Sequence, residues 1–204
     1  ENVEYKLDPS IKNEGNILIF ASMWDEDNKI IFEKFINSPL VNHFEKVIIV
    51  PHEVNDYYLN YYCSVLEDND FSFKKINQYQ NFNQFEEKYI IVNKVGFLSK
   101  LYAQSTITYV GGGFSKSGIH NIIEPAAASN PVIFGSNFLN SNKSDAEGLI
   151  DVSGGFSVDS YELFTEKINW LLDKNNYNNS SKNCKTFVTE NSGSTEKILK
   201  ELYE

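Results

Sequence analysis

One stretch of the chain limits the possible folds more than any other. Residues 107–128 read ITYVGGGFSKSGIHNIIEPAAA, in which a β-branched run, three glycines, a polar loop and an alanine-rich segment follow without a spacer. The apolar run predicts a buried strand from Thr106 to Val110. Glycine permits positive φ and lets a ligand approach the backbone. A helix beginning between Ile119 and Asn121 would direct its free amides and partial positive charge toward an anion. The stretch therefore predicts a strand-to-helix phosphate turn.

An acid and a proline near the start of the predicted helix refine this hypothesis. Glu124 would lie about one turn into the helix, where a carboxylate can accept hydrogen bonds from two vicinal hydroxyls of a ribose. Pro125 is compatible with a helix only in its first turn. The loop matches neither the dinucleotide fingerprint, because Lys116 stands at the place of the third glycine, nor the P-loop. A turn that only packs a helix on a strand stays open as an alternative.

Three segments resemble a known family. Residues 111–114 (GGGF), 118–127 (GIHNIIEPAA) and 131–135 (PVIFG) are similar to the nucleotide-binding segment of 3-deoxy-D-manno-octulosonate (Kdo) transferases. The similarity extends from Ala21 to Leu199. It implies the C-terminal, donor-binding half of a two-Rossmann-domain (GT-B) glycosyltransferase, which takes Kdo from CMP-Kdo and transfers it to a lipid A precursor.

The same resemblance carries further expectations. The catalytic base and the acceptor site would belong to a missing N-terminal domain, so no catalytic residue is expected in this chain and the piece alone should be inactive. No cofactor or metal is expected. The full-length protein would work at the cytoplasmic face of the bacterial inner membrane, and any membrane contact would be made through the missing half.

Several other loops are candidates for donor contacts. Ser22 and Trp24 follow the first predicted strand, and a first βα turn of a parallel sheet lies at the ligand crevice; helix capping by Ser22 or Asp25 is the alternative. The family has a similar Ser-x-Trp-x-x-(Asp/Glu) there. His52 follows the second predicted strand, Lys46 to Pro51, in a Pro-His-Glu turn. Some members of the family have a similar Pro-His-Glu and others have Pro-Arg-His, so His52 would take the place of that arginine; an ordinary polar loop residue is the alternative. The predicted donor site comprises Ser22, Trp24, Pro51, His52, Gly96, Phe97, Gly111, Gly112, Gly113, Gly118, Ile119, His120, Asn121 and Glu124.

Alternating strands and helices predict the fold class. Short buried runs separated by helical patterns favour a Rossmann-like, doubly wound α/β domain of about six mostly parallel strands. We expect residues 1–15 to be a linker and residues 16–204 to form one nucleotide-sugar binding domain. We also expect a polar loop from Asn137 to Glu147, an Asn-rich turn from Asp173 to Ser181, and two final helices.

Composition excludes several kinds of function. The formal net charge of −10 argues against nucleic acid as a partner. All 18 basic residues are lysine, so a bidentate arginine clamp on phosphate is impossible. Two separate cysteines, Cys63 and Cys184, and three scattered histidines form no metal-binding pattern. The chain has no apolar run of the ~18 residues that a membrane span needs, and we expect the piece to be soluble.

Two alternative functions stay open at this point. Another nucleotide-sugar transferase of the GT-B type would be distinguished by binding UDP instead of CMP. A non-catalytic nucleotide-binding or protein-interaction module would be favoured if the natural gene product began near Glu1. The length of that gene product is therefore the most informative single observation.

Overall fold

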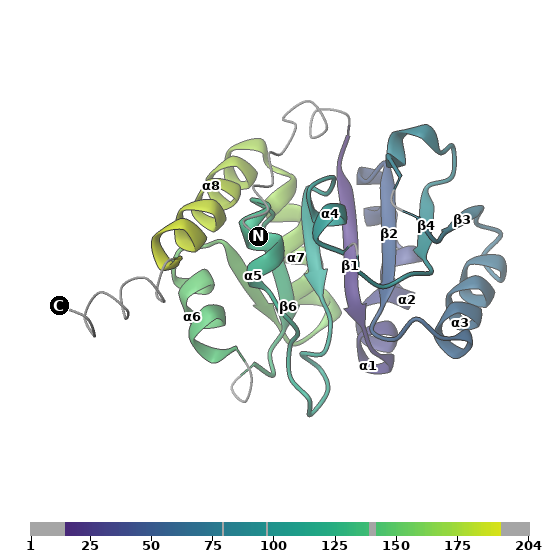
Figure 1. Cartoon of the computed structure of the whole chain (residues 1–204), viewed down its shortest axis with the longest axis horizontal. Helices are drawn as coiled ribbons and strands as arrows, with labels where there is room; N and C mark the ends of the chain where they lie inside the picture. Colours follow the sequence, from purple (N-terminus) through teal and green to yellow (C-terminus); the bar gives the residue numbers. More distant parts are fainter. Residues whose placement is uncertain (1–14, 79, 97, 139–141, 193–204) are drawn as a thin grey trace.

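The computed structural model describes residues 15–78, 80–96, 98–138 and 142–192. They form a seven-stranded sheet in the order β3-β4-β2-β1-β5-β6-β7, and every neighbouring pair is parallel (Figure 1). The strands are β1 (Ile17–Met23), β2 (Lys46–Pro51), β3 (Phe73–Ile76), β4 (Tyr89–Val92), β5 (Ile107–Val110), β6 (Val132–Gly135) and β7 (Gly155–Val158). The predicted α/β class is confirmed, with seven strands where about six were expected.

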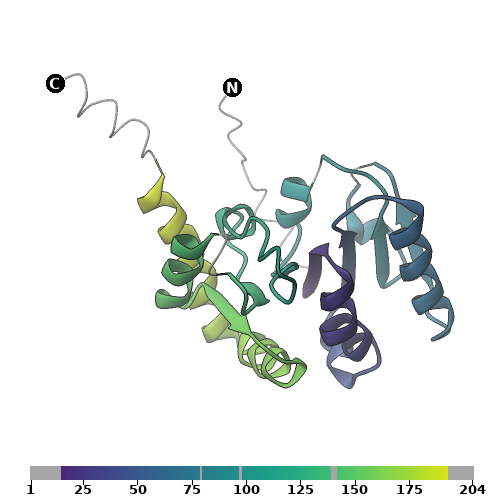
Figure 2. The same ribbon diagram turned by 90° about the horizontal axis from the view of Figure 1, so that it is seen from below.

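Helices cover both faces of the sheet, as a view from below shows (Figure 2). They are α1 (Asp25–Asp27), the π-helical η2 (Asn28–Phe32), α2 (Glu33–Ile36), the 3-10 helix η3 (Pro39–His43), α3 (Asp56–Glu67), the 3-10 helix η4 (Phe82–Gln84), α4 (Leu98–Tyr102), α5 (Ile123–Ala127), α6 (Lys143–Asp151), α7 (Tyr161–Leu172) and α8 (Lys174–Asn191). The buried side chains of η2, α2, α3 and α7 join one core, whereas those of α4, α5, α6 and α8 lie in two cores on the other face.

The first of these cores is built around an aromatic ring on the central strand. Phe20 is fully buried, and its ring centroid lies 5.5 Å from that of Phe32, 5.2 Å from Phe35 and 5.7 Å from Tyr109. Edge-to-face and tilted pairs of this kind add a little to the free energy gained by burying the rings. These rings pack the first helical segment, η2 and α2, against the central strand.

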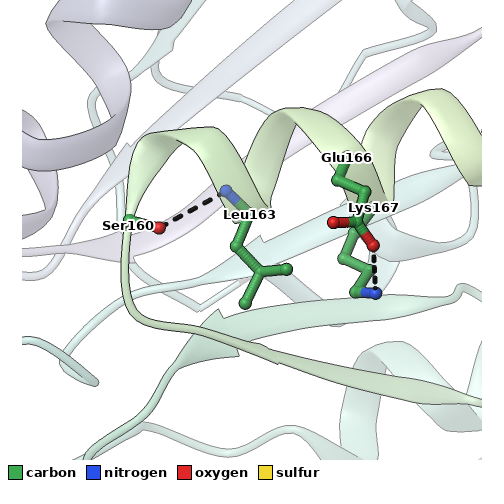
Figure 3. Close-up of polar contacts among 4 residues, drawn as sticks. All are labelled: Ser160, Leu163, Glu166 and Lys167. Carbon is green, nitrogen blue, oxygen red and sulfur yellow. Dashed lines mark hydrogen bonds and ion pairs between the residues drawn. The ribbon is translucent and has the colours of Figure 1, made fainter.

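Short polar side chains fix the starts of the longer helices. Ser160 Oγ accepts a hydrogen bond from the Leu163 amide at 3.4 Å and caps α7, and Lys167 pairs with Glu166 on the exposed side of the same helix (Figure 3). Asn55 caps α3 in the same way, by accepting from the Tyr58 amide. Such caps satisfy amides that the helix itself leaves free.

The C-terminal region differs from the predicted secondary structure. Residues 174–181 were expected to form a turn, but they are the first turns of α8, because Asp173 Oδ1 accepts hydrogen bonds from the amides of Asn175 and Asn176. The helix is polar on average, yet Ser180 and Cys184 anchor it in the core. A single helix, α8, thus stands in place of the expected turn and the first of the two expected helices. Residues 193–204, where the second was expected, lie outside the described residues.

Two further expectations about secondary structure were wrong. The polar segment from Asn137 to Glu147 contains the first half of α6, which begins at Lys143 and buries Ala146 and Leu149 against β7. The helix after the glycines begins at Ile123, later than expected. Residues 1–14 of the expected linker lie outside the described residues.

The order of the strands determines where a ligand is expected. From β1 the chain builds β2, β3 and β4 on one side, and then returns to place β5, β6 and β7 on the other side (Figure 1). The strand order therefore switches between β1 and β5. In open α/β sheets, ligands bind outside the carboxyl ends of the strands at such a point.

Candidate functional site

The three glycines after β5 pack tightly against neighbouring backbone. A Cβ atom at Gly111 would lie 2.4 Å from the Ser22 carbonyl oxygen, and one at Gly113 would lie 2.5 Å from Gly135 Cα. Only Gly112 has positive φ, at 95°, and a Cβ there would lie 2.3 Å from the Gly118 carbonyl oxygen. Of the three, one glycine is therefore required by its backbone conformation, and all three by close packing between loops.

A buried carboxylate, which the sequence did not identify as a site residue, holds this turn. Asp27 is fully buried and accepts hydrogen bonds from the Tyr109 hydroxyl at 2.6 Å, the Gly112 amide at 2.8 Å and the Trp24 amide at 3.0 Å. Burial raises the pKa of Asp27 above its usual value, and these hydrogen bonds oppose that shift. Asp27 thus joins the loop after β1 to the loop after β5. Two sequence signals pointed to it: its place at the end of the Ser-x-Trp-x-x-(Asp/Glu) pattern of the resembled family, and an acid in a first helical turn, which is also typical of simple dipole stabilisation.

Three rings from three loops stack beside the turn formed by Gly111, Gly112 and Gly113, which we call the glycine turn. The ring centroid of Trp24 lies 4.0 Å from that of His52, and the His52 centroid lies 4.4 Å from that of His120. The indole Nε1 of Trp24 donates a hydrogen bond of 2.7 Å to His120 Nε2. All three residues were predicted to contact a donor nucleotide, and the fold brings them together from the carboxyl ends of β1, β2 and β5. We call this group the ring stack.

The protonation state of the ring stack follows from its geometry. An indole N–H is only a donor, so His120 Nε2 must be the unprotonated acceptor, and the proton of the neutral ring lies on Nδ1. Burial, and then the neighbouring His52, lower the pKa of His120. Burial also lowers the pKa of His52, while the Glu53 carboxylate opposes this shift. Both imidazoles are therefore neutral at neutral pH.

Asn121 and Glu124 lie at the start of α5. Asn121 Oδ1 accepts from the amides of Ile123 at 2.9 Å and Glu124 at 3.3 Å, and its Nδ2 donates to Glu124 Oε1 at 2.9 Å. Asn121 is thus the side-chain cap of the helix. Glu124 is exposed, and this contact uses only one of its two carboxylate oxygens. This arrangement is compatible with a carboxylate positioned for hydroxyl groups of a ligand.

Comparison with known proteins adds to this geometry, although no family model matches the chain. It is 27% identical to the 3-deoxy-D-manno-octulosonic acid transferase of Rickettsia bellii over 205 residues, which are 96% of this chain and 45% of the relative. It is 29% identical to the enzyme of that name from Aquifex aeolicus over 79% of this chain and 43% of the relative. The chain is similar to 3-deoxy-D-manno-octulosonic acid transferases. It spans less than half of the length of these curated relatives.

Solved structures support the fold assignment. The C-terminal CMP-Kdo binding domain of WaaA from Acinetobacter baumannii superposes with a TM-score of 0.71 at 17% identity, covering 88% of this chain and 91% of that domain. A glycosyltransferase from Rickettsia africae gives a TM-score of 0.58 at 15% identity, over 93% of this chain and 46% of that protein. The expected architecture, the C-terminal half of a GT-B fold, is confirmed.

The remaining predicted site residues surround the ring stack or lie apart from it. Ser22 lies at a β-bulge of β1 with a left-handed φ of 54°. The N-cap of the first helix is Trp24, so neither Ser22 nor Asp25, which is already helical, caps it. Pro51 ends β2, and the His52 amide donates to the Met23 carbonyl at 3.0 Å. Gly118 has a φ of 81° and adjoins Gly112.

Three more predicted residues, Ile119, Gly96 and Phe97, and one that was missed, Asn142, remain to be placed. The carbonyl oxygens of Ile119 and His120 both accept from Asn142 Nδ2 at 3.2 Å, a contact that no sequence pattern indicated. Gly96 has a φ of 96° with open space around it, while Phe97 lies outside the described residues. In the part of the chain that the structure describes, no three His, Cys, Asp or Glu side chains group into a metal site, and no helix is long and apolar enough to span a bilayer.

Proposed function

We propose that this chain is the donor-binding domain of a Kdo transferase, which binds CMP-Kdo while Kdo is transferred to a lipid A precursor. One observation carries the proposal. Trp24, His52 and His120 meet beside the glycine turn at the β1/β5 switch point, in a chain whose similarity to Kdo transferases covers 96% of its length. The catalytic base and the acceptor site are assigned to a part of the protein outside this chain.

Each group at the site has a role in this proposal. Glu124 accepts hydrogen bonds from the ribose hydroxyls, and the ring stack contacts the nucleotide next to its phosphate. The loop backbone and the ring stack stabilise the negative charge that develops on the CMP phosphate when its bond to Kdo breaks. No metal ion is needed for this stabilisation. The full-length protein is proposed to act at the cytoplasmic face of the inner membrane.

Nucleotide binding by the purified chain tests the proposal. With a dissociation constant of ~1 mM, about 5 mM CMP would stabilise the fold by roughly 1 kcal/mol, a rise of about 2 to 4 °C in melting temperature for a domain of this size. The same shift should occur with EDTA present. UDP at the same concentration is the matched control, because it carries a second phosphate group and has uracil in place of cytosine.

The outcomes separate the rival functions. A shift with CMP and none with UDP supports the donor-binding domain. An equal or larger shift with UDP would instead favour another nucleotide-sugar transferase. No shift with any nucleotide would favour an interaction module, and a shift that disappears with EDTA would contradict the metal-free site.

A further inference from the structure

The site lacks the arginine that often clamps phosphate, because the chain contains none. Its one lysine, Lys116, is exposed in the loop after the glycines. Within the glycine turn, the Gly111 amide already donates to the Ala21 carbonyl and the Gly112 amide to Asp27. Two of the three glycine amides are therefore not available to an anion, which leaves a larger part of phosphate neutralisation to side chains.

The ring stack contains two imidazoles, but they are not equivalent as proton acceptors. His120 Nε2 accepts the Trp24 indole proton at 2.7 Å. Protonation of His120 would place two N–H groups against each other and break that hydrogen bond. His120 is thus held in the neutral form as long as the ring stack is intact.

His52 is free of this restriction. Among the described residues, neither ring nitrogen of His52 makes a hydrogen bond. Its ring is stacked on the Trp24 indole at 4.0 Å with an interplanar angle of 20°. A cation over an indole face is favoured by the ring quadrupole, so protonation of His52 would strengthen this contact.

We propose that binding of a nucleotide phosphate draws one proton onto His52, and that the resulting imidazolium is the cation that neutralises the phosphate. This inference rests on the proposed nucleotide-binding function and adds a proton to the binding equilibrium. His120 is a positioning residue that holds the Trp24 indole under His52. Burial disfavours the charged form in the free protein, which leaves the proton to be taken up when the anion arrives.

The other charged groups on the same loops set the background for this titration. His52 is followed by Glu53, whose carboxylate favours the imidazolium. The other charged residues within five positions of the three rings in the sequence are Asp25, Glu26, Asp27, Lys29, Asp56, Lys116 and Glu124. Since acids outnumber the two lysines, these neighbours favour a protonated His52 and oppose direct binding of an anion to a neutral site.

Proton linkage can be measured directly on the intact chain. Calorimetric titration with CMP in buffers of different ionisation enthalpy should show uptake of about half a proton or more per CMP bound near pH 7.5, and CMP affinity should increase about tenfold from pH 8.5 to pH 6.5. Cytidine, which lacks the phosphate, should bind with no uptake. The imidazole NMR signals should place the proton on His52 in the complex and leave His120 neutral.

Variants of the three histidines separate the possible proton acceptors. His52→Gln should match the wild-type CMP affinity near pH 8.5 and be about tenfold weaker near pH 6.5. His52→Arg supplies a permanent cation, so it should bind more tightly than wild type near pH 8.5 with no proton uptake. His43→Gln, an exposed histidine in η3 at the opposite edge of the sheet, is the matched control and should behave as wild type.

Three results would overturn the inference. CMP binding without proton uptake would leave the proposed function intact and refute the role of His52. If proton uptake is lost in His120→Gln and retained in His52→Gln, then His120, and not His52, takes up the proton. Absence of any CMP binding would refute both this inference and the proposed function.

Discussion

The glycine turn and the ring stack lie side by side at the carboxyl edge of the sheet, but they are built differently. In the glycine turn, backbone touches backbone: Gly111 against Ser22 and Gly113 against Gly135, with the Asp27 carboxylate on the Gly112 amide. In the ring stack, side chains meet face to face, and both histidines are partly exposed. The glycine turn is part of the packed interior, whereas the ring stack borders solvent.

The residues of the glycine turn therefore hold the site together, whereas those of the ring stack can contact a ligand. Substitutions in the glycine turn should be felt first as a loss of stability, because they force backbone atoms apart or leave buried donors unpaired. Substitutions at the exposed groups should be felt first in nucleotide affinity. Four predictions test whether the two regions divide in this way.

The largest effect is expected at Gly112. Gly112→Ala should lower the free energy of unfolding by at least about 4 kcal/mol, because a methyl group would meet the Gly118 carbonyl oxygen at 2.3 Å in addition to the left-handed backbone. Gly96→Ala is the matched control, since Gly96 has a φ of 96° with nothing within 4 Å. It should cost only about 1 to 2 kcal/mol. Equal losses in a urea titration would show that the glycine turn can relax.

Asp27 should come second. Asp27→Ala leaves the amides of Trp24 and Gly112 and the Tyr109 hydroxyl without their acceptor, at a cost of about 3 kcal/mol, or roughly 6 to 12 °C in melting temperature. Glu26→Ala is the control, because Glu26 is the neighbouring exposed acid. Its free energy of unfolding should stay within about 0.5 kcal/mol of wild type. A melting curve of Asp27→Ala that overlays the wild type would mean that Asp27 does not join the two loops.

Glu124 tests the exposed side of the comparison. If its carboxylate holds the ribose hydroxyls, Glu124→Gln should weaken CMP binding by ~1.5 to 3 kcal/mol, or roughly tenfold to a hundredfold, with little change in stability. Glu162→Gln is the matched control, because Glu162 is also an exposed acid at the second position of a helix, but after the edge strand β7. Unchanged CMP affinity with a lower melting temperature would make Glu124 a residue that only complements the helix dipole.

The smallest effect concerns the pH dependence of stability without ligand. The pKa values of His52 and His120 are lowered in the fold, so the stability that they contribute is present above the unfolded value of about 6.5 and is lost as pH falls through the folded pKa values. Partial exposure keeps this change below about 1 kcal/mol. The double variant His52→Gln/His120→Gln should flatten the curve of melting temperature between about pH 7 and pH 5. A curve that parallels the wild type would show that the two rings titrate as they do in the unfolded chain.

The sequence was informative wherever a pattern is local. The strand, glycine and helix order of residues 107–128 predicted the turn, and the positions of Trp24, His52 and His120 after three predicted strands placed them at one edge, because the carboxyl ends of parallel strands meet there. The ring contacts themselves were not predictable. They depend on a sheet order in which β2 and β5 both neighbour β1.

The misses have a common physical cause. Asp27 lies in a first helical turn that contains three acids, and only the tertiary fold decides which acid is buried. The Asn-rich start of α8 has weak helix propensity, but capping by Asp173 and burial of Cys184 outweigh it. In both cases long-range packing overrides a local preference.

The π-helical turn η2 has a consequence for how this chain is matched to its relatives. Directly before and within it, the adjacent residues Asp27 and Asn28 both face inward, where they accept hydrogen bonds from the hydroxyls of Tyr109 and Tyr62. A π-helical turn holds one more residue than an α-helical turn. A relative with a regular α-helix here would therefore be one residue shorter, and at 25 to 29% identity the corresponding gap is easily put in the wrong place. An alignment should be anchored separately at Trp24 and at Phe35, so that residue correspondences at the nucleotide site are not displaced by one.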